Sequence, residues 1–294
     1  MKTRWNLLFK VMLTITLLMV MKAGAAFAET GNVDWQNGNI TAKAIGIPAA
    51  YSVNASQQKA TAIRAAQVQA QRNLLETIQG VRIDANTTVE SMMLINDTVR
   101  TSVNGLLKGS RIIDERPLGD GSWEVTVGIG MFPTAPGQPS LSEPVYRSIV
   151  PTIPDPLPQP VHPFTPQLQV PSSVSNYSFG HTGVIIDVTG FALTRSFSPA
   201  IYADDGMPVY GARNINADYA ISKGMVEYAA PEDWNGLEIG TSRAGRSPLV
   251  IKAIGIRDRE CDVIITRADA DRLLTANQGG SFLQQCKVVF KMSN

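Results

Sequence analysis

The chain is poor in the residue types that proteins most often use for catalysis and metal binding. Its 294 residues include only two histidines, His162 and His181, and two cysteines. No pair of these residues has metal-ligand spacing, and no serine or cysteine lies in a recognisable nucleophile turn. A hydrolase would need His181 as its base, and an exposed loop histidine is the simpler interpretation. The residues alone therefore reveal no chemistry, and we assign no catalytic, cofactor-binding or metal-binding residues.

Net charge and long apolar runs are also scarce. The formal net charge is +1, and residues 1–28 hold four basic residues and no acidic residue, so about −3 remains for residues 29–294. That balance argues against a nucleic-acid-binding protein, which needs a concentrated basic surface. The apolar run at residues 11–21 is too short to span a bilayer, and we expect no transmembrane segment after it.

The first 28 residues have the pattern of a secretory signal peptide. Lys2, Arg4 and Lys10 precede the apolar run, and small residues at positions 26 and 28 flank a cleavage motif that ends at Ala28. We predict cleavage after Ala28 and export of the mature chain. Neither cysteine comes directly after Ala28, so we expect no lipid-modified cysteine at the new N-terminus.

Cys261 and Cys286 are predicted to form a disulfide, because an exported protein meets an oxidising compartment. Each cysteine directly precedes a predicted strand, at residues 262–266 and 287–291, with a helix at 268–276 between the strands. Parallel pairing of these strands in register would place the cysteines side by side. The alternative is two reduced, buried thiols.

A proline-rich stretch divides the mature chain. Residues 133–171 contain 12 of the 18 prolines. Proline fixes φ and lacks an N–H group, so this stretch is predicted to be an extended, semi-rigid spacer between two domains, 33–132 and 172–294. A recognition peptide for a proline-binding partner is the alternative.

The fold class predicted for both domains is α+β. In the first domain, helices are expected on one face of a small, largely antiparallel sheet with the order β-α-β-α-β-β. Its predicted elements are a strand at 40–47, a helix from Ser56 to about residue 79 with Gly80 as its stop, a strand at 81–85, a helix at 96–107 and a hairpin whose second arm is 123–129, with its turn at 119–121. The apolar stripe of the long helix comprises Ala60, Ile63, Ala66, Ala70, Leu74 and Ile78. Alanine at so many of these positions lets the helix lie close to the sheet.

The second domain is expected to be richer in strands. Its other predicted elements are a buried strand at 183–188, a hairpin of 199–202 and 208–210, a short helix capped by Asn216 and ending near Gly224, and a strand at 249–256. The hairpin turn at 204–206 lacks the further oxygen ligands that a calcium loop requires.

An aspartate and three tryptophans are candidates for residues of a catalytic or ligand-binding site. Asp187 lies in an apolar strand, where an unpaired carboxylate is costly, and it is either a site residue with a perturbed pKa or a strand-end aspartate bonded to backbone or to Arg195. Trp35 and Trp234, with the loops near Arg243, are candidates for stacking on sugar rings, whereas Trp123 alternates with core residues and is expected to be buried.

Two segments resemble known envelope proteins. Residues 40–80, with a strand at 42–46 and an alanine-rich helix that ends in residues 70–76, resemble the N-terminal domain of flagellar assembly protein T and the related small outer-membrane lipoproteins of the Lpp-twenty type. Residues 182–190, with the following segments to 211, look like a companion segment of the same proteins. The resemblance implies an exported, non-enzymatic scaffold or assembly factor in the periplasm or at the periplasmic face of the outer membrane, and it carries over no catalytic residues.

On this reading the partners are envelope proteins, including flagellar basal-body components, or a second copy of the chain. The alternative is a periplasmic module that binds a glycan or a small solute through Trp35 or Trp234. A secreted hydrolase using Asp187 or His181 is the third hypothesis.

Overall fold

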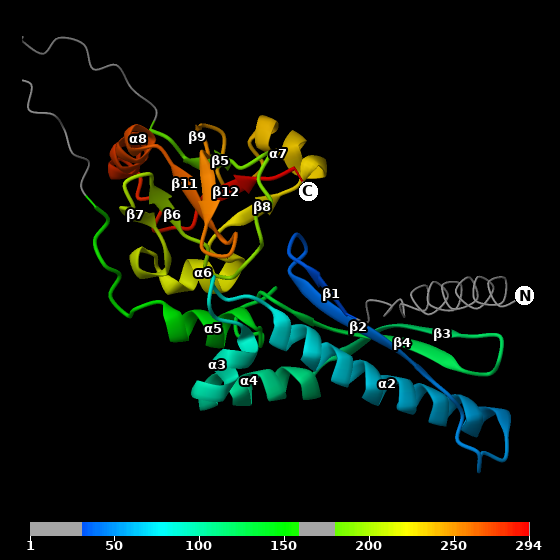
Figure 1. The fold of residues 1–294 in the computed structure, drawn as a ribbon. Helices are drawn as coiled ribbons and strands as arrows, with labels where there is room; N and C mark the ends of the chain where they lie inside the picture. The colour runs from blue at the N-terminus through cyan, green and yellow to red at the C-terminus, as the bar shows by residue number, and fades with distance from the viewer. Residues whose placement is uncertain (1–30, 159–179, 294) are drawn as a thin grey trace, which may run out of the picture. The chain divides into compact units, whose positions relative to one another are not determined.

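A computed structural model describes residues 31–158 and 180–293 (Figure 1), so the predicted signal peptide, its cleavage site at Ala28 and His162 lie outside the described residues. The described chain is α+β, as predicted. The elements before residue 158 are β1 (Gly31–Asp34), β2 (Asn39–Gly46), α2 (Ala55–Gly80), α3 (Val89–Ile95), α4 (Asp97–Lys108), β3 (Arg111–Pro117), β4 (Trp123–Gly130) and α5 (Ser142–Ile149).

The elements after residue 180 are mostly short strands. They are β5 (Gly183–Asp187), β6 (Ile201–Ala203), β7 (Pro208–Tyr210), α6 (Ala217–Lys223), β8 (Glu227–Ala229), α7 (Trp234–Ile239), β9 (Pro248–Lys252), β10 (Gly255–Arg257), β11 (Asp262–Ile265), α8 (Arg267–Gln278) and β12 (Val288–Lys291), with 3₁₀ turns at Ala212–Asn214 and Pro231–Asp233.

The first sheet is antiparallel with the strand order β1-β2-β4-β3, and α2 lies along one of its faces (Figure 1). Alternate residues of β2 and β4 turn toward the helix, and Ile40, Val125 and Val127 are buried there. The predicted alternation in β4 is therefore confirmed, with Trp123 only half-buried at the start of the strand. A period of two is what a strand with one covered face requires.

Helix α2 begins two residues earlier than predicted. Asn54, not Ser56, is its N-cap, because the Asn54 side chain accepts a hydrogen bond from the Gln57 backbone N–H at 2.9 Å. The buried stripe includes Ala66, Ala70, Leu74 and Ile78, as predicted, but Ala62 replaces Ala60 at its N-terminal end. The small side chains allow the helix backbone to approach β2 closely.

The strand predicted at residues 81–85 is wrong. This segment forms only an isolated bridge between Arg82 and Thr88. The cause is a turn in which Asp84 Oδ1 accepts hydrogen bonds from the backbone N–H groups of Asn86 and Thr87, at 2.8 and 2.9 Å. Thr88 then caps α3, a helix that the prediction missed, and α4 follows at the predicted place.

Two four-stranded sheets form the second half of the molecule. One is parallel with the order β8-β12-β5-β9, and the other is mixed with the order β10-β11-β6-β7. Strand β5 lies in the middle of the parallel sheet, between β12 and β9. Its residues Gly183 to Ile186 are buried, which confirms the predicted buried strand. The single strand predicted at 249–256 is instead two strands, β9 and β10, one in each sheet.

The predicted disulfide is absent, because Cys261 and Cys286 are both free and buried. The predicted pairing of the two strands that follow them is also wrong. Strand β11 pairs with β6 and β10, whereas β12 pairs with β5 and β8 in the other sheet. Burial raises the pKa of both thiols, that of Cys286 to about 11, so they stay protonated and unreactive.

The proline-rich stretch is not extended throughout. Residues 142–149 form α5, and Val145 and Tyr146 are completely buried. Pro144 is tolerated because it lies in the first turn, where a backbone N–H has no partner inside the helix. Residues 159–171 of the predicted spacer lie outside the described residues.

Candidate functional site

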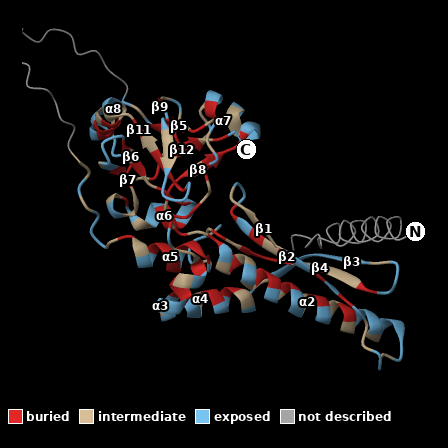
Figure 2. Ribbon diagram, in the orientation of Figure 1, coloured by how far each residue is buried: buried red, intermediate tan, exposed pale blue. Residues whose placement is uncertain are grey.

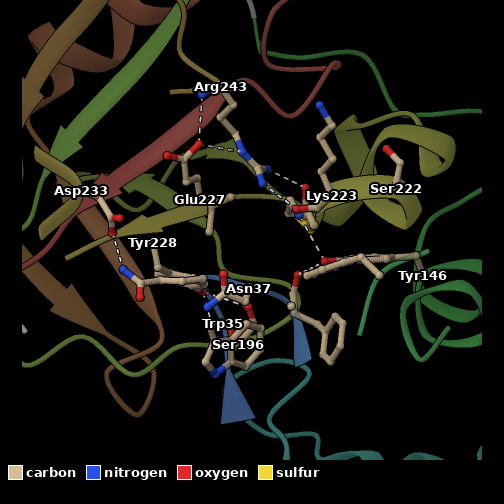
Figure 3. A pocket seen from close by; sticks show the side chains of 17 residues that line it. Trp35, Asn37, Tyr146, Ser196, Ser222, Lys223, Glu227, Tyr228, Asp233 and Arg243 are labelled. Carbon is tan, nitrogen blue, oxygen red and sulfur yellow. Dashed lines mark hydrogen bonds and ion pairs between the residues drawn. The ribbon is translucent and has the colours of Figure 1, made fainter. Parts of the chain in front are cut away.

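A cavity of about 290 Å³ lies where the two halves of the described chain meet (Figure 3). Its walls come from the β1–β2 turn and α5 on one side, and from the segments around Ser196, α6 and β8 on the other. The polar side chains at its wall include Trp35, Tyr146, Ser196, Lys223 and Arg243. It thus brings together Trp35 and Arg243, two residues that the sequence singled out for ligand binding.

An aromatic cluster built around the buried side chain of Phe197 forms one wall. The ring of Phe197 lies edge-on to the rings of Trp35, Tyr146 and Phe132, with centroid separations of 5.4, 5.7 and 6.1 Å. Trp35 also meets Tyr228 at 5.7 Å. Edge-to-face pairs of this kind contribute about 0.5–1.5 kcal/mol each beyond their burial. Trp35 therefore joins the two halves, and little of its ring remains to stack on a sugar.

Two buried tyrosine hydroxyls tie backbone segments together across this contact. Tyr146 Oη donates to the Phe197 carbonyl at 2.7 Å and accepts from the Met225 N–H at 3.2 Å. Tyr228 Oη donates to the Ser196 carbonyl and accepts from the Ser196 N–H, both at 2.9 Å. Burial raises the pKa of both tyrosines, so each hydroxyl keeps its proton and does not act as a base at neutral pH.

Arg243 holds the end of α6 in place (Figure 3). Its guanidinium donates to the carbonyl oxygens of Lys223 at 2.6 Å, Gly224 at 2.9 Å and Cys286 at 3.3 Å. Its Nε lies 3.4 Å from a carboxylate oxygen of Glu227, which also accepts from the Arg243 backbone N–H at 3.0 Å. A cation at the last carbonyls of a helix is favourable. The guanidinium is therefore occupied by the protein itself.

Few polar atoms in the cavity remain for a ligand. The clearest is Ser196 Oγ, which is buried and has no hydrogen-bond partner among the described residues. Within the described part of the chain, no histidine, cysteine or carboxylate is hydrogen-bonded to this hydroxyl. The arrangement suits a rigid contact between two halves better than a nucleophilic reaction, which needs an adjacent base.

Asp187 is a strand-end aspartate and not a perturbed site carboxyl. Its Oδ1 accepts hydrogen bonds from the Thr189 N–H at 3.0 Å and the Thr189 hydroxyl at 2.6 Å. Partial burial raises its pKa, but those two bonds and the charges of Lys291 and Lys252 outweigh the burial and lower the pKa below the ordinary value. The predicted hydrogen bond between Asp187 and the backbone is confirmed. The positive charges that lower its pKa are those of Lys291 and Lys252.

The other candidates also have structural surroundings. Asp205 lies in the β6–β7 turn, where it accepts from the Met207 N–H and pairs with Arg267 at 2.7 Å, so the predicted hairpin turn is confirmed. The ammonium group of Lys291 lies over the Trp234 ring at 4.2 Å. His181 is partly buried beside β5, outside the cavity. Among the described residues, no group of three or more acidic, histidine or cysteine side chains is arranged to hold a metal.

The sequence analysis missed Asp262, the most deeply buried carboxylate near a cavity. It lines a second cavity of about 430 Å³ with Asp84, Asp258 and Tyr202, and only 7% of its surface is exposed. Its Oδ1 accepts from the Ala200 N–H at 2.8 Å. Burial, reinforced by Asp258 and Asp84 and opposed by that bond and by Arg257, raises the pKa of Asp262 to about 6. A carboxylate at one end of an apolar strand was the signal that drew attention to Asp187, and the same signal is present at Asp262, the first residue of β11.

Asp262 is expected to make the protein more stable in mild acid. Because its pKa is higher in the folded chain than in the unfolded chain, folding takes up a proton between about pH 6 and pH 4, and the free energy of unfolding rises as pH falls through that window. The gain is on the order of 2 kcal/mol after allowance for solvent screening. Denaturant unfolding at about pH 7 and at about pH 4.5, in the lower part of that window, measures it.

Asp262→Asn should remove most of that pH dependence, since the amide keeps the acceptor for Ala200 but does not titrate. Asp187→Asn is the matched control, because the pKa of Asp187 is lowered and its stabilisation is lost only at more acidic pH. Equal pH profiles for the wild type and Asp262→Asn would contradict this assignment.

Two known families match separate parts of the chain. Residues 38–130 match the LPP20 lipoprotein family. Residues 183–294 match the family model described as Treponema pallidum Tp0624, second domain. The first match spans β2 to β4, and the second begins at β5 and includes both sheets of the second half. No curated protein matches the chain.

The LPP20 match supports the likeness to envelope lipoproteins inferred from the sequence, and with it an exported, envelope-associated protein. The likeness to flagellar assembly protein T stays a prediction. Within the described residues, no helix has both the length and the apolar character needed to cross a membrane.

Proposed function

We propose that this protein is an exported, non-enzymatic scaffold or assembly factor of the cell envelope that acts through protein–protein contacts. The LPP20 match supports the envelope, and the self-satisfied polar groups of the central cavity favour a structural role for it. In its finer form the proposal includes work in the periplasm or at the periplasmic face of the outer membrane, with flagellar basal-body components as candidate partners.

Strand β3 is the observation that carries the proposal. Among the described residues it pairs only with β4, at the edge of the antiparallel sheet β1-β2-β4-β3, and all seven of its residues are exposed. An exposed edge presents unpaired backbone N–H and C=O groups, and such edges bind partners by adding a strand. The side chains of β3 carry both signs of charge, at Arg111, Asp114, Glu115 and Arg116. A partner strand with complementary charges would therefore be preferred over others.

The centre of this edge is apolar. Ile113 occupies a bulge in the β3–β4 pairing and lies over Gly128, with 60% of its surface exposed. Nothing among the described residues covers it, so it contributes little to the core. We take β3 and Ile113 together as the β3 edge and propose that an envelope protein or a second copy of the chain binds there by strand addition.

Ile113→Lys is expected to reduce recovery of the cross-linked partner by at least about tenfold, because a lysine on an edge strand opposes strand addition. The tagged protein is cross-linked in intact cells and purified from the envelope. Ile95→Lys is the matched control, since Ile95 is 84% exposed at the end of α3, away from β3. Unchanged recovery with Ile113→Lys would rule out the β3 edge as the binding surface.

A glycan- or solute-binding module is the second candidate. It is favoured by the unpartnered hydroxyl of Ser196 and by the presence of Trp35 in the same cavity. Thermal stabilisation of the wild type by cell-wall fragments, lost in Ser196→Val, would support it over the scaffold. No shift in the unfolding temperature would leave the scaffold as the better account.

A further inference from the structure

The loop between β2 and α2 exposes large apolar side chains that take no part in the core. Ile47, Tyr51 and Val53 are 73%, 74% and 85% exposed, and Ile45 at the end of β2 is 56% exposed. Figure 2 shows this loop and the first turns of α2 as mostly exposed. Single exposed apolar residues are ordinary, but four within nine residues make a patch that marks an interaction surface.

The loop holds this conformation through its polar residues, which turn toward the helix. Ala49 N–H donates to Thr61 Oγ1 at 3.2 Å, Ser52 Oγ lies 3.2 Å from the same hydroxyl, and Val53 N–H donates to the Gln57 side chain at 3.0 Å. Asn54 caps α2. Polar groups thus face inward and apolar groups face outward, the reverse of the usual arrangement. The patch is therefore presented by a fixed loop.

The charged residues in the sequence segment around the patch are all basic. From Trp35 to Leu75 the sequence has no aspartate or glutamate, whereas it has Lys43, Lys59, Arg64 and Arg72. The first turn of α2 carries no acidic residue, so its free N–H groups add to the positive potential.

The carboxylate nearest in the sheet is already neutralised. Glu124, which pairs with Ile45 across β2 and β4, forms an ion pair with Arg116 at 2.6 Å. Asp120, in the turn before β4, accepts hydrogen bonds from Ser122 at 2.9 and 2.5 Å. Lys59, in contrast, has no carboxylate partner among the described ion pairs, and its ammonium group lies over the half-buried ring of Trp123 at 4.5 Å, near the start of α2.

We propose that residues 45–53, with Lys43 and Lys59, form a docking surface for an anionic phospholipid bilayer. Aliphatic side chains and a tyrosine enter the interfacial region, and the lysines meet the lipid phosphates. A protein partner that adds a strand fits less well, because Pro48 has no backbone N–H group and ends the run of residues that could pair with it. The proposal deepens the envelope role proposed above by naming the surface to which the chain attaches.

Vesicle flotation of the purified protein tests the proposal. Vesicles of phosphatidylethanolamine and phosphatidylglycerol in equal parts should carry the wild type, and phosphatidylcholine vesicles should carry at least about tenfold less. A combined variant, Ile47→Ser, Tyr51→Ser and Val53→Ser, should lose at least about tenfold in binding to the anionic vesicles, because it removes most of the inserted apolar area. Its unfolding temperature should stay that of the wild type, because these side chains are exposed.

The matched control is Leu94→Ser with Ile95→Ser, which removes two side chains that are equally exposed but lie at the end of α3 beside acidic residues. This control should bind vesicles like the wild type. Absence of wild-type flotation, or equal flotation of the loop variant and the control, would overturn the proposal. Neither result would affect the β3 edge, which is tested by cross-linking and not by lipid binding.

Discussion

Gly46→Ala is expected to lower the free energy of unfolding by about 3 kcal/mol or more, because the added methyl group meets backbone that cannot move aside. A Cβ at this position would lie 2.1 Å from the Ala62 carbonyl oxygen and 2.4 Å from the Ala66 N. Both atoms belong to the middle of α2, whose alanine stripe lies directly on the end of β2. The helix would have to leave the sheet, and the core between them would open. Denaturant unfolding of the purified protein measures the loss.

Gly105→Ala is the control for Gly46→Ala. Gly105 lies within α4, and nothing stands within 4 Å of the place where its Cβ would be. Alanine is a better helix former than glycine, so this variant should be stabilised by about 0.5–1 kcal/mol. A Gly46→Ala protein as stable as the wild type would show that α2 does not pack against β2 as described.

Arg243→Ala is expected to cost about 3 kcal/mol and to loosen the contact between the two halves. The substitution leaves Glu227 without its ion pair and removes the donor to three carbonyl oxygens at the end of α6 and before β12. Breaking a largely buried pair from one side is costly because the remaining charge stays unpaired. Thermal or denaturant unfolding gives the magnitude, and faster amide exchange in α6 would locate it.

Arg147→Ala provides the comparison, because the same residue type is removed from an exposed pair. Arg147 lies 3.2 Å from Glu143 in α5, and more than half of its side chain is exposed. A pair of this kind contributes about 0.5 kcal/mol or less. If both arginine variants lost the same small amount, the role assigned to Arg243 would be wrong.

Local features of the fold could be predicted because short-range chemistry determines them. Asn96 and Asn216 cap helices as their residue type suggests, and the turn at 204–206 reverses the chain between two short strands. The alternation in β4 is visible because one face of the strand is covered. The apolar pattern of residues 81–85 predicted a strand. The Asp84 side chain instead accepts hydrogen bonds from the next residues and forms a turn, which prevents the strand.

Features that depend on distant contacts could not be predicted. The apolar runs before and after α8 look like neighbouring strands, but each pairs with a strand from elsewhere in the chain, and this separates the two cysteines. The cavity wall joins Tyr146 to Phe197, which lie 51 residues apart in sequence. The partners of Arg243 are backbone carbonyl oxygens, which have no sequence signature. Trp35 and Arg243 line the same cavity, but the role of Trp35 there is packing.

Site-specific photo-cross-linking tests the central claim, that the protein works through partners bound at the β3 edge. A photoreactive amino acid replaces Ile113 in one strain and Ile95 in another, both exposed and apolar. Illumination of intact cells should give a defined, higher-mass adduct in the envelope fraction from position 113 and none from position 95. No adduct from position 113, or the same adducts from both positions, would contradict the account.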